Sequence, residues 1–147
     1  LIKNYSTEVP LQKTIFEIQE LLRENGASGV AFDYDPEGSL TGIQFRIIYN
    51  TKDLYFKLPI DPQKVYAILF GDKVGQNNQN WKTERINKSV MIAARICKLW
   101  LEAQLTHVNL EQAKIQEVFL PYLMTAENQT LYQKLEKNQF LLGEGKK

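Results

Sequence analysis

The chain has 147 residues, a length that fits one compact domain, and contains 44% hydrophobic and 24% charged residues. These fractions are typical of a globular protein and exclude a wholly disordered, collagen-like or coiled-coil chain. With 18 basic and 17 acidic side chains, the formal net charge is +1, which argues against a strongly basic nucleic-acid coat.

The first half of the chain predicts one helix followed by three strands. Residues 1–8 are polar, and we expect them to form a loose N-terminal arm. Pro10 and Gly26 bracket a stretch with apolar residues at helical spacing, which predicts a helix. Apolar side chains then recur at every second position over 28–59, with turn residues at 35–38 and 50–53. This pattern predicts a three-stranded antiparallel meander with one apolar face.

The second half predicts helices that cover this face. Asp61 and Pro62 are an N-cap and a first-turn proline, and predict a short helix that ends at Gly71. Residues 71–81 are rich in Gly, Asn and Gln without periodicity, which predicts a mobile loop. The longest helix is expected over 83–108. Apolar residues cover most of the circumference of this helix, so we expect it to pack centrally against several other elements. Three of its apolar residues should be buried: Val90, Cys97 and Leu101.

The C-terminal third predicts two shorter helices and a tail. Asn109 with Gln112 forms a potential capping box for a helix through Phe119, and 130–138 predicts a last helix. The fold class is therefore α+β, a three-stranded antiparallel meander packed against helices in the order α-β-β-β-α-α-α-α with a long central helix. We expect a single domain over 9–140 and a disordered tail over 141–147.

Several segments resemble one family. They are KTIFEIQELLRENGA (13–27), IQFRI (43–47), KLPID (57–61), AARICKLWLEAQL (93–105), EVFLPYLM (117–124) and QTLYQKLE (129–136). In this order they resemble a family of small uncharacterised proteins encoded by tailed phages and prophages, over roughly residues 9–136. The resemblance implies a phage origin and an accessory role inside the host cell. It implies no reaction.

The sequence offers no constellation of catalytic or metal-binding residues. His107 has no second histidine near it, and Cys97 sits on an apolar helix face, where a thiol acts as a small hydrophobe. No phosphate-binding glycine loop, HExxH or CxxC motif is present. We therefore expect no catalytic residue, metal or cofactor. No apolar run is long enough to span a bilayer and no secretory signal is recognised, so we expect a protein of the host cytoplasm.

The net positive charge is concentrated in residues 73–98, which carry six basic and one acidic side chain. Together with a Gln/Asn-rich loop, these cations could contact phosphates while an aromatic ring stacks on a base. The candidate nucleic-acid-binding residues here are Trp81, Lys82, Arg85, Lys88 and Arg95. The alternative is a solvated helix face, in which Lys88 pairs with Glu84, and Lys98 with Glu102, at i,i+4 spacing.

The face of the meander away from the core is a second candidate surface. It presents Arg46, Tyr55 and Lys57 beside Gln44, an aromatic ring and two cations that could meet a single strand. The alternative is a sheet face that is simply solvated or is covered by a helix.

The functional expectation is a non-enzymatic phage accessory protein that acts on DNA metabolism by binding DNA or RNA through the basic segment. The alternative is a protein-binding factor that inhibits or redirects a host protein, including a host defence system. Aromatic side chains beyond those that one core can hide, such as Trp100 and Tyr132, would support the alternative.

Overall fold

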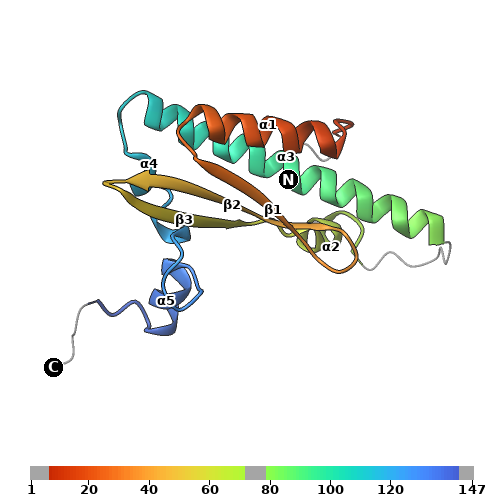
Figure 1. The fold of residues 1–147 in the computed structure, drawn as a ribbon. Coiled ribbons are helices and arrows are strands. Elements are labelled where there is room, and N and C mark those ends of the chain that lie inside the picture. The colour runs from red at the N-terminus through yellow and green to blue at the C-terminus, as the bar shows by residue number, and fades with distance from the viewer. Residues whose placement is uncertain (1–6, 72–78, 143–147) are drawn as a thin grey trace.

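The computed structural model describes residues 7–71 and 79–142 and shows the expected α+β fold (Figure 1). The order of elements is α-β-β-β-α-α-α-α, with one 3-10 turn before the last helix. The bounds are α1 (Leu11–Glu24), β1 (Gly29–Tyr34), β2 (Leu40–Tyr49), β3 (Lys52–Pro59), α2 (Pro62–Leu69), α3 (Gln79–Asn109), α4 (Ile115–Val118), η1 (Leu120–Tyr122) and α5 (Leu131–Lys137).

Helix α1 ends where the sequence predicts. Gly26 follows it with a φ of +105°, and the Gly26 N–H donates to the carbonyl of Arg23 at 3.2 Å. The next N–H, that of Ala27, donates to the carbonyl of Leu22 at 3.0 Å. This pair of hydrogen bonds satisfies the last carbonyls of the helix and turns the chain toward β1.

The three strands form one antiparallel sheet in the order β1-β2-β3, which confirms the predicted meander. The first turn is closed by the Gly38 N–H, which donates to the carbonyl of Asp35 at 2.8 Å. The second turn is tighter than predicted, because only Asn50 and Thr51 lie between Tyr49 and Lys52, which face each other across the strands. Both turn residues have positive φ, +50° and +67°, as a two-residue hairpin that matches the strand twist requires.

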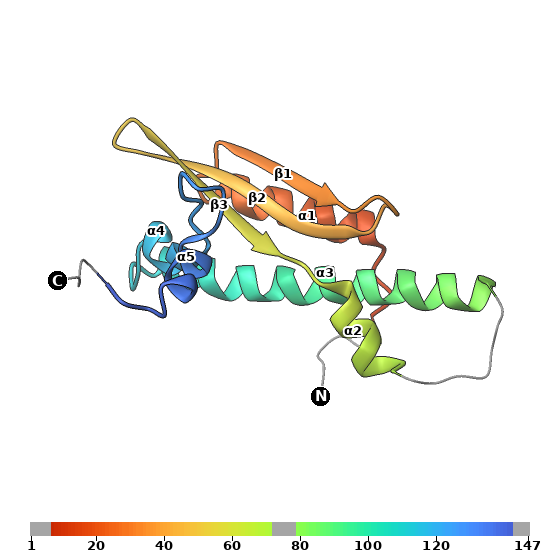
Figure 2. The same ribbon diagram turned by 90° about the horizontal axis from the view of Figure 1, so that it is seen from below.

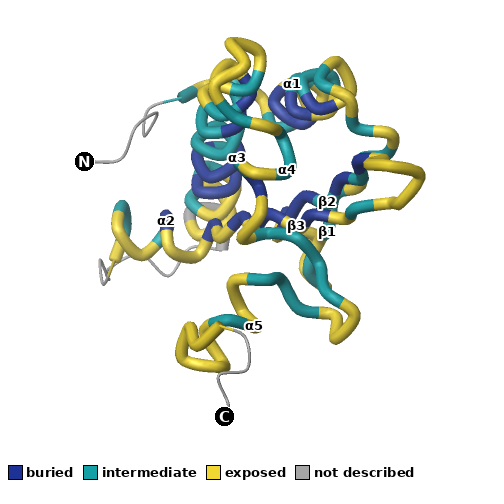
Figure 3. Tube along the Cα trace, turned by 90° about the vertical axis from the view of Figure 1, so that its left-hand side faces the viewer, coloured by how far each residue is buried: buried dark blue, intermediate teal, exposed yellow. Residues whose placement is uncertain are grey.

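Helices α1 and α3 lie side by side on one face of this sheet, and the buried residues gather between the helices and the strands (Figure 3). Phe45 and Phe56, paired across β2 and β3, stack with ring centroids 5.1 Å apart. Phe119, which follows α4, meets Phe45 edge-on at 5.2 Å, and Trp100 of α3 meets Phe119 at 5.7 Å. This aromatic cluster joins the sheet, the central helix and the C-terminal segment in one core.

Helix α3 is longer at its start than the sequence predicts. It begins at Gln79, so residues 79–81 are helical, whereas the rest of the predicted loop, 72–78, lies outside the described residues. Val90 and Leu101 are buried as predicted, whereas Cys97, which was also predicted to be buried, is only half-buried. Helix α2 crosses α3 near its N-terminal half (Figure 2).

The predicted cap at Asn109 is wrong. Asn109 is the last residue of α3, and Leu105, one turn earlier, is still buried, so packing carries the helix to its end. The next helix, α4, begins only at Ile115 and is short. The last helix is confirmed: the Gln133 N–H donates to Thr130 Oγ1 at 3.2 Å in a capping box.

The C-terminal segment returns to the other side of the sheet. The Met124 N–H donates to the carbonyl of Tyr55 at 2.7 Å, and Leu123 bridges to Phe56, so the segment is fastened to the edge of β3. Helix α5 consequently lies on the side of the sheet opposite α1 and α3 (Figures 1 and 3). Of the predicted disordered tail, Leu141 and Leu142 are exposed, and 143–147 lie outside the described residues.

Candidate nucleic-acid interface

Arg95, a candidate of the basic segment, is held in a contact between helices. Its Nη1 lies 2.6 Å from Oε1 of Glu17 on α1, and the two side chains are only 19% and 27% exposed. The same carboxylate is 4.0 Å from Nζ of Lys98, which also bonds Glu102 at 2.9 Å. The hydrogen bond from Arg95, more than the nearby positive charges, holds the pKa of Glu17 below its usual range. These cations therefore tie α1 to α3.

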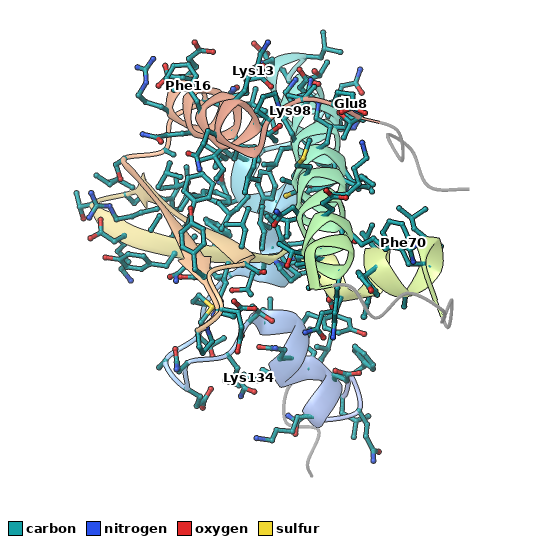
Figure 4. The ribbon with its side chains drawn as sticks, turned by 90° about the vertical axis from the view of Figure 1, so that its right-hand side faces the viewer. Glu8, Lys13, Phe16, Phe70, Lys98 and Lys134 are labelled. Carbon is teal, nitrogen blue, oxygen red and sulfur yellow. The ribbon has the colours of Figure 1, made fainter. Side chains whose placement is uncertain are left out.

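Lys88 is engaged in a similar way. Its Nζ donates to the backbone carbonyl of Thr7, and it lies 3.3 Å from the carboxylate of Glu8. The predicted pairing with Glu84 is replaced by this contact with the chain just ahead of α1. Thr7 and Glu8 are thus fastened, although we expected a loose arm there; residues 1–6 lie outside the described ranges. Figure 4 shows Glu8 and Lys98 on the helical side of the sheet and Lys134 on the other.

The first turns of α3 hold the other candidates of the basic segment. The guanidinium of Arg85 lies 4.6 Å above the ring of Phe70, where α2 ends, so it packs α3 against α2. Lys82 is exposed beside a hollow whose lining includes Asp35 and Glu37. Trp81 is part of α3, but its side chain lies outside the described residues. The structure therefore does not gather these candidates into one exposed basic stripe.

The second candidate surface is brought together by the register of the sheet. Arg46 of β2 faces Tyr55 of β3, and Gln44 faces Lys57 in the next row. All four lie on the face away from α1 and α3. This face is turned toward the viewer in Figure 2, where β1 and β2 lie in front of α1. Tyr55 is 48% exposed and Lys57 is exposed, so no helix or loop within residues 7–71 and 79–142 covers this part of the face.

Hydrogen bonds hold the polar side chains of this face in place. Nε of Arg46 donates to Ser28 Oγ at 2.8 Å, and its Nη2 donates to the Ser28 carbonyl at 3.1 Å. Nε2 of Gln44 lies 3.0 Å from both carboxylate oxygens of Asp33 on β1. The guanidinium is therefore positioned by neutral groups, and the neighbouring carboxylate is occupied by an amide.

The charge on this face differs from that on α3. Within residues 7–71 and 79–142, no carboxylate lies within 4.0 Å of a side-chain nitrogen of Arg46 or Lys57. The face also exposes an apolar side chain, Ile48, to 57%, opposite Asp53 near the hairpin end. The face thus combines two cations without ion pairs, the carboxylates of Asp33 and Asp53, one exposed aromatic ring and an aliphatic residue.

A groove adjoins this face that the sequence did not reveal. It lies between the end of β3, at Lys57 and Pro59, and the C-terminal segment, and has a volume of about 510 Å³. Asn128, Tyr132 and Gln133 line it from the C-terminal side. The sequence predicted a helix over 130–138, but no local signal showed that this helix would return to the sheet. Its position depends on the bridge between β3 and residue 123.

Other chemistry is limited in the described part of the chain. It contains no group of three or more His, Cys, Asp and Glu side chains placed to hold a metal ion. His107 is exposed near the end of α3. Burial raises the pKa of the Cys97 thiol to about 12, which suppresses its reactivity. None of the helices in these residues combines the length and apolar character needed to cross a bilayer.

No protein-family model, curated protein or solved structure matches this chain.

Proposed function

We propose that this chain is a non-enzymatic binding protein that holds single-stranded nucleic acid on the open face of its sheet. The observation that supports this proposal is the placement of Arg46, Tyr55 and Lys57 on one uncovered face, with the two cations free of ion pairs in the described residues. Cations of this kind neutralise phosphates, and an exposed tyrosine stacks on a base.

The proposal moves the contact from the basic segment to the sheet. Arg95 and Lys88 are already paired with carboxylates on or just ahead of α1, so phosphate binding there would have to break ion pairs that join the helices. Arg46 and Lys57 would lose no such pair. An open sheet face with an exposed ring suits unstacked bases, whereas duplex DNA is typically read by an element that enters a groove.

Fluorescence anisotropy with a labelled single-stranded oligonucleotide at about 50 mM salt tests the proposal, because low salt favours phosphate contacts. The double variant Arg46→Gln/Lys57→Gln should weaken binding, and its salt slope should fall by about 1.4 if each cation meets one phosphate of a single strand. The matched control is Lys13→Gln/Lys64→Gln, which removes two exposed cations from α1 and α2. It should bind like the wild type.

The stacking contact has its own pair of variants. Tyr55→Ala should weaken binding by about 5- to 150-fold if the ring stacks on one base, whereas Tyr55→Phe should retain most of the affinity. Equal loss in the charge variant and its control would refute a specific role of the sheet face. A large loss in Lys82→Gln alone would return the contact to the start of α3.

A second candidate function is supported by Ile48, which is 57% exposed, and by Tyr49, which is 45% exposed, at the hairpin end of the sheet. Aromatic and Arg side chains around an exposed aliphatic residue also suit the centre of a protein interface. If no DNA or RNA binds at low salt, we propose that this face binds a host protein. Ile48→Asp should then abolish capture of that protein, while Phe16→Asp on α1 should not.

The biological setting follows from the family resemblance and stays a prediction. We propose an accessory role in phage DNA metabolism within the host cytoplasm, which capture from infected lysate with and without nuclease would test. Nuclease-sensitive capture would support it, and nuclease-resistant capture of one protein would favour the second function.

A further inference from the structure

The groove beside the sheet face is built by contacts that the proposed binding surface does not use. The bond from the Met124 N–H to the Tyr55 carbonyl holds the C-terminal segment against β3, and the capping box of Thr130 then starts α5. This arrangement sets Tyr132 and Gln133 across from Lys57 and Pro59 of the strand. The volume of about 510 Å³ lies within the range of small-ligand pockets.

The chemistry of this groove is positive and rich in amides. Among the described residues that line it, Lys57 is the one with a charge; the others are apolar or carry hydroxyl or amide groups, among them Asn128, Thr130, Tyr132 and Gln133. The larger hollow beside α2, about 820 Å³, is lined instead, within the described part of the chain, by three carboxylates, those of Asp35, Glu37 and Asp61, against one lysine. A hollow of that charge repels phosphate, whereas the groove beside β3 attracts it.

Two amides of the groove are available to a ligand. Oε1 of Gln133 accepts the Thr130 N–H at 2.9 Å, which leaves its NH2 group without a partner in the described residues. Asn128 is exposed and has a φ of +60°, and its side chain makes no hydrogen bond within the same residues. Tyr132 is 46% exposed. Amide groups beside an accessible ring are the groups that proteins use to bind the edge and the face of an unpaired base.

We propose that this groove receives one unpaired base of the strand that the sheet face holds, an inference that rests on the proposed function. Lys57 belongs to both surfaces, and Tyr55 precedes it by two residues on the same face of β3, about 6.6 Å away along the strand. One base stacks on Tyr55, the next enters the groove against Tyr132, and Lys57 meets a phosphate between them. The amides of Asn128 and Gln133 bond the edge of the second base.

The test compares an intact oligonucleotide with one that lacks a base. The probes are a labelled single-stranded dA12 and the same strand with two adjacent abasic sites at its centre. The double variant Asn128→Gly/Tyr132→Ala removes the amide and the ring, and glycine keeps the positive φ at 128. Tyr132→Phe is the control that retains the ring. Circular dichroism and thermal unfolding establish that each variant is folded.

We expect the double variant to bind dA12 about tenfold more weakly than the wild type, and Tyr132→Phe to bind it as tightly as the wild type. The wild type should bind the abasic strand more weakly than dA12, and the double variant should discriminate less between the two strands. Placing 2-aminopurine at successive positions of dA12 should reveal one position whose fluorescence depends on Tyr132. If the wild type binds dA12 and the double variant binds it equally, or if no position responds to Tyr132→Ala, the groove takes no base, although the sheet face still binds the strand. If the wild type binds no oligonucleotide, the proposed function and this inference fail together.

Discussion

Breaking the contact between Arg95 and Glu17 should destabilise the protein without weakening nucleic-acid binding. The two side chains lie 2.6 Å apart between α1 and α3 and are 19% and 27% exposed, so the pair is partly shielded from water. A charged hydrogen bond of this kind contributes about 1.5–3 kcal/mol. Glu17→Gln and Arg95→Gln should each lower the free energy of unfolding by about that amount.

The double variant Glu17→Gln/Arg95→Gln should lose less than the sum of the two single variants. Each single change leaves the other partner of a partly buried pair uncompensated, whereas the double change leaves neither. We expect a coupling free energy of about 1 kcal/mol or more. Urea unfolding can be followed by the fluorescence of Trp100, whose ring lies 5.7 Å from those of Phe119 and Tyr122 and should respond to loss of the core.

The pH dependence has a definite sign. The hydrogen bond from Arg95 lowers the pKa of Glu17 from its ordinary value of 4.5. The stabilisation is therefore complete above about pH 4.5 and is lost as the pH falls through the lower pKa of the folded state. Below pH 4.5 the free energy of unfolding of the wild type should approach that of Glu17→Gln. The structural role would be refuted if the losses of unfolding free energy in the two single variants were strictly additive and the stability difference between wild type and Glu17→Gln stayed the same in acid. Weaker oligonucleotide binding by folded Arg95→Gln would place Arg95 in the interface.

Three further predictions concern the core, the hairpin and the thiol. Leu101→Ala should lower the free energy of unfolding by about 2–5 kcal/mol in urea titrations, because Leu101 is fully buried; a near-neutral result would move the core elsewhere. Thr51→Gly should raise the free energy of unfolding by about 0.5–1 kcal/mol, because Thr51 has a φ of +67°, a conformation that glycine adopts without strain. A lower melting temperature of this variant would contradict the reason. Cys97 should react with iodoacetamide at pH 8.5 more slowly in the folded than in the urea-unfolded protein, since burial raises its pKa to about 12; equal rates would show that the thiol is accessible.

The parts of the fold that the sequence predicted are those fixed by local chemistry. Gly26 ends α1, and Asp61 accepts the Lys64 N–H at the start of α2, because each depends on residues only a few positions away. The prediction that Asn109 caps the next helix was wrong, because Asn109 is a good cap in isolation, whereas tertiary packing around Leu105 keeps Asn109 within α3. The bridge between Leu123 and β3 joins distant segments and has no alternating pattern to reveal it.

The candidate site was predicted in part for the same reason. Period-two alternation placed Arg46, Tyr55 and Lys57 on one face correctly, since the sheet register follows from short turns. The charge of α3 was harder to interpret, because Glu17 and Glu8, the partners of Arg95 and Lys88, lie far away in sequence. The i,i+4 spacing within α3 could predict only the ion pair that Lys98 forms with Glu102 on the same helix.

The separation between the partners of the α1–α3 contact bears on the order of folding. The two hairpins close over a few residues, whereas Arg95 and Glu17 are 78 positions apart and Arg95 and Thr14 are 81 apart. Closing a longer loop costs more chain entropy, so the meander can form before α1 docks on α3. A contact made after the rate-limiting step slows unfolding and leaves the folding rate unchanged. Ion pairs between these helices that form after that step lengthen the lifetime of the native state without speeding its formation.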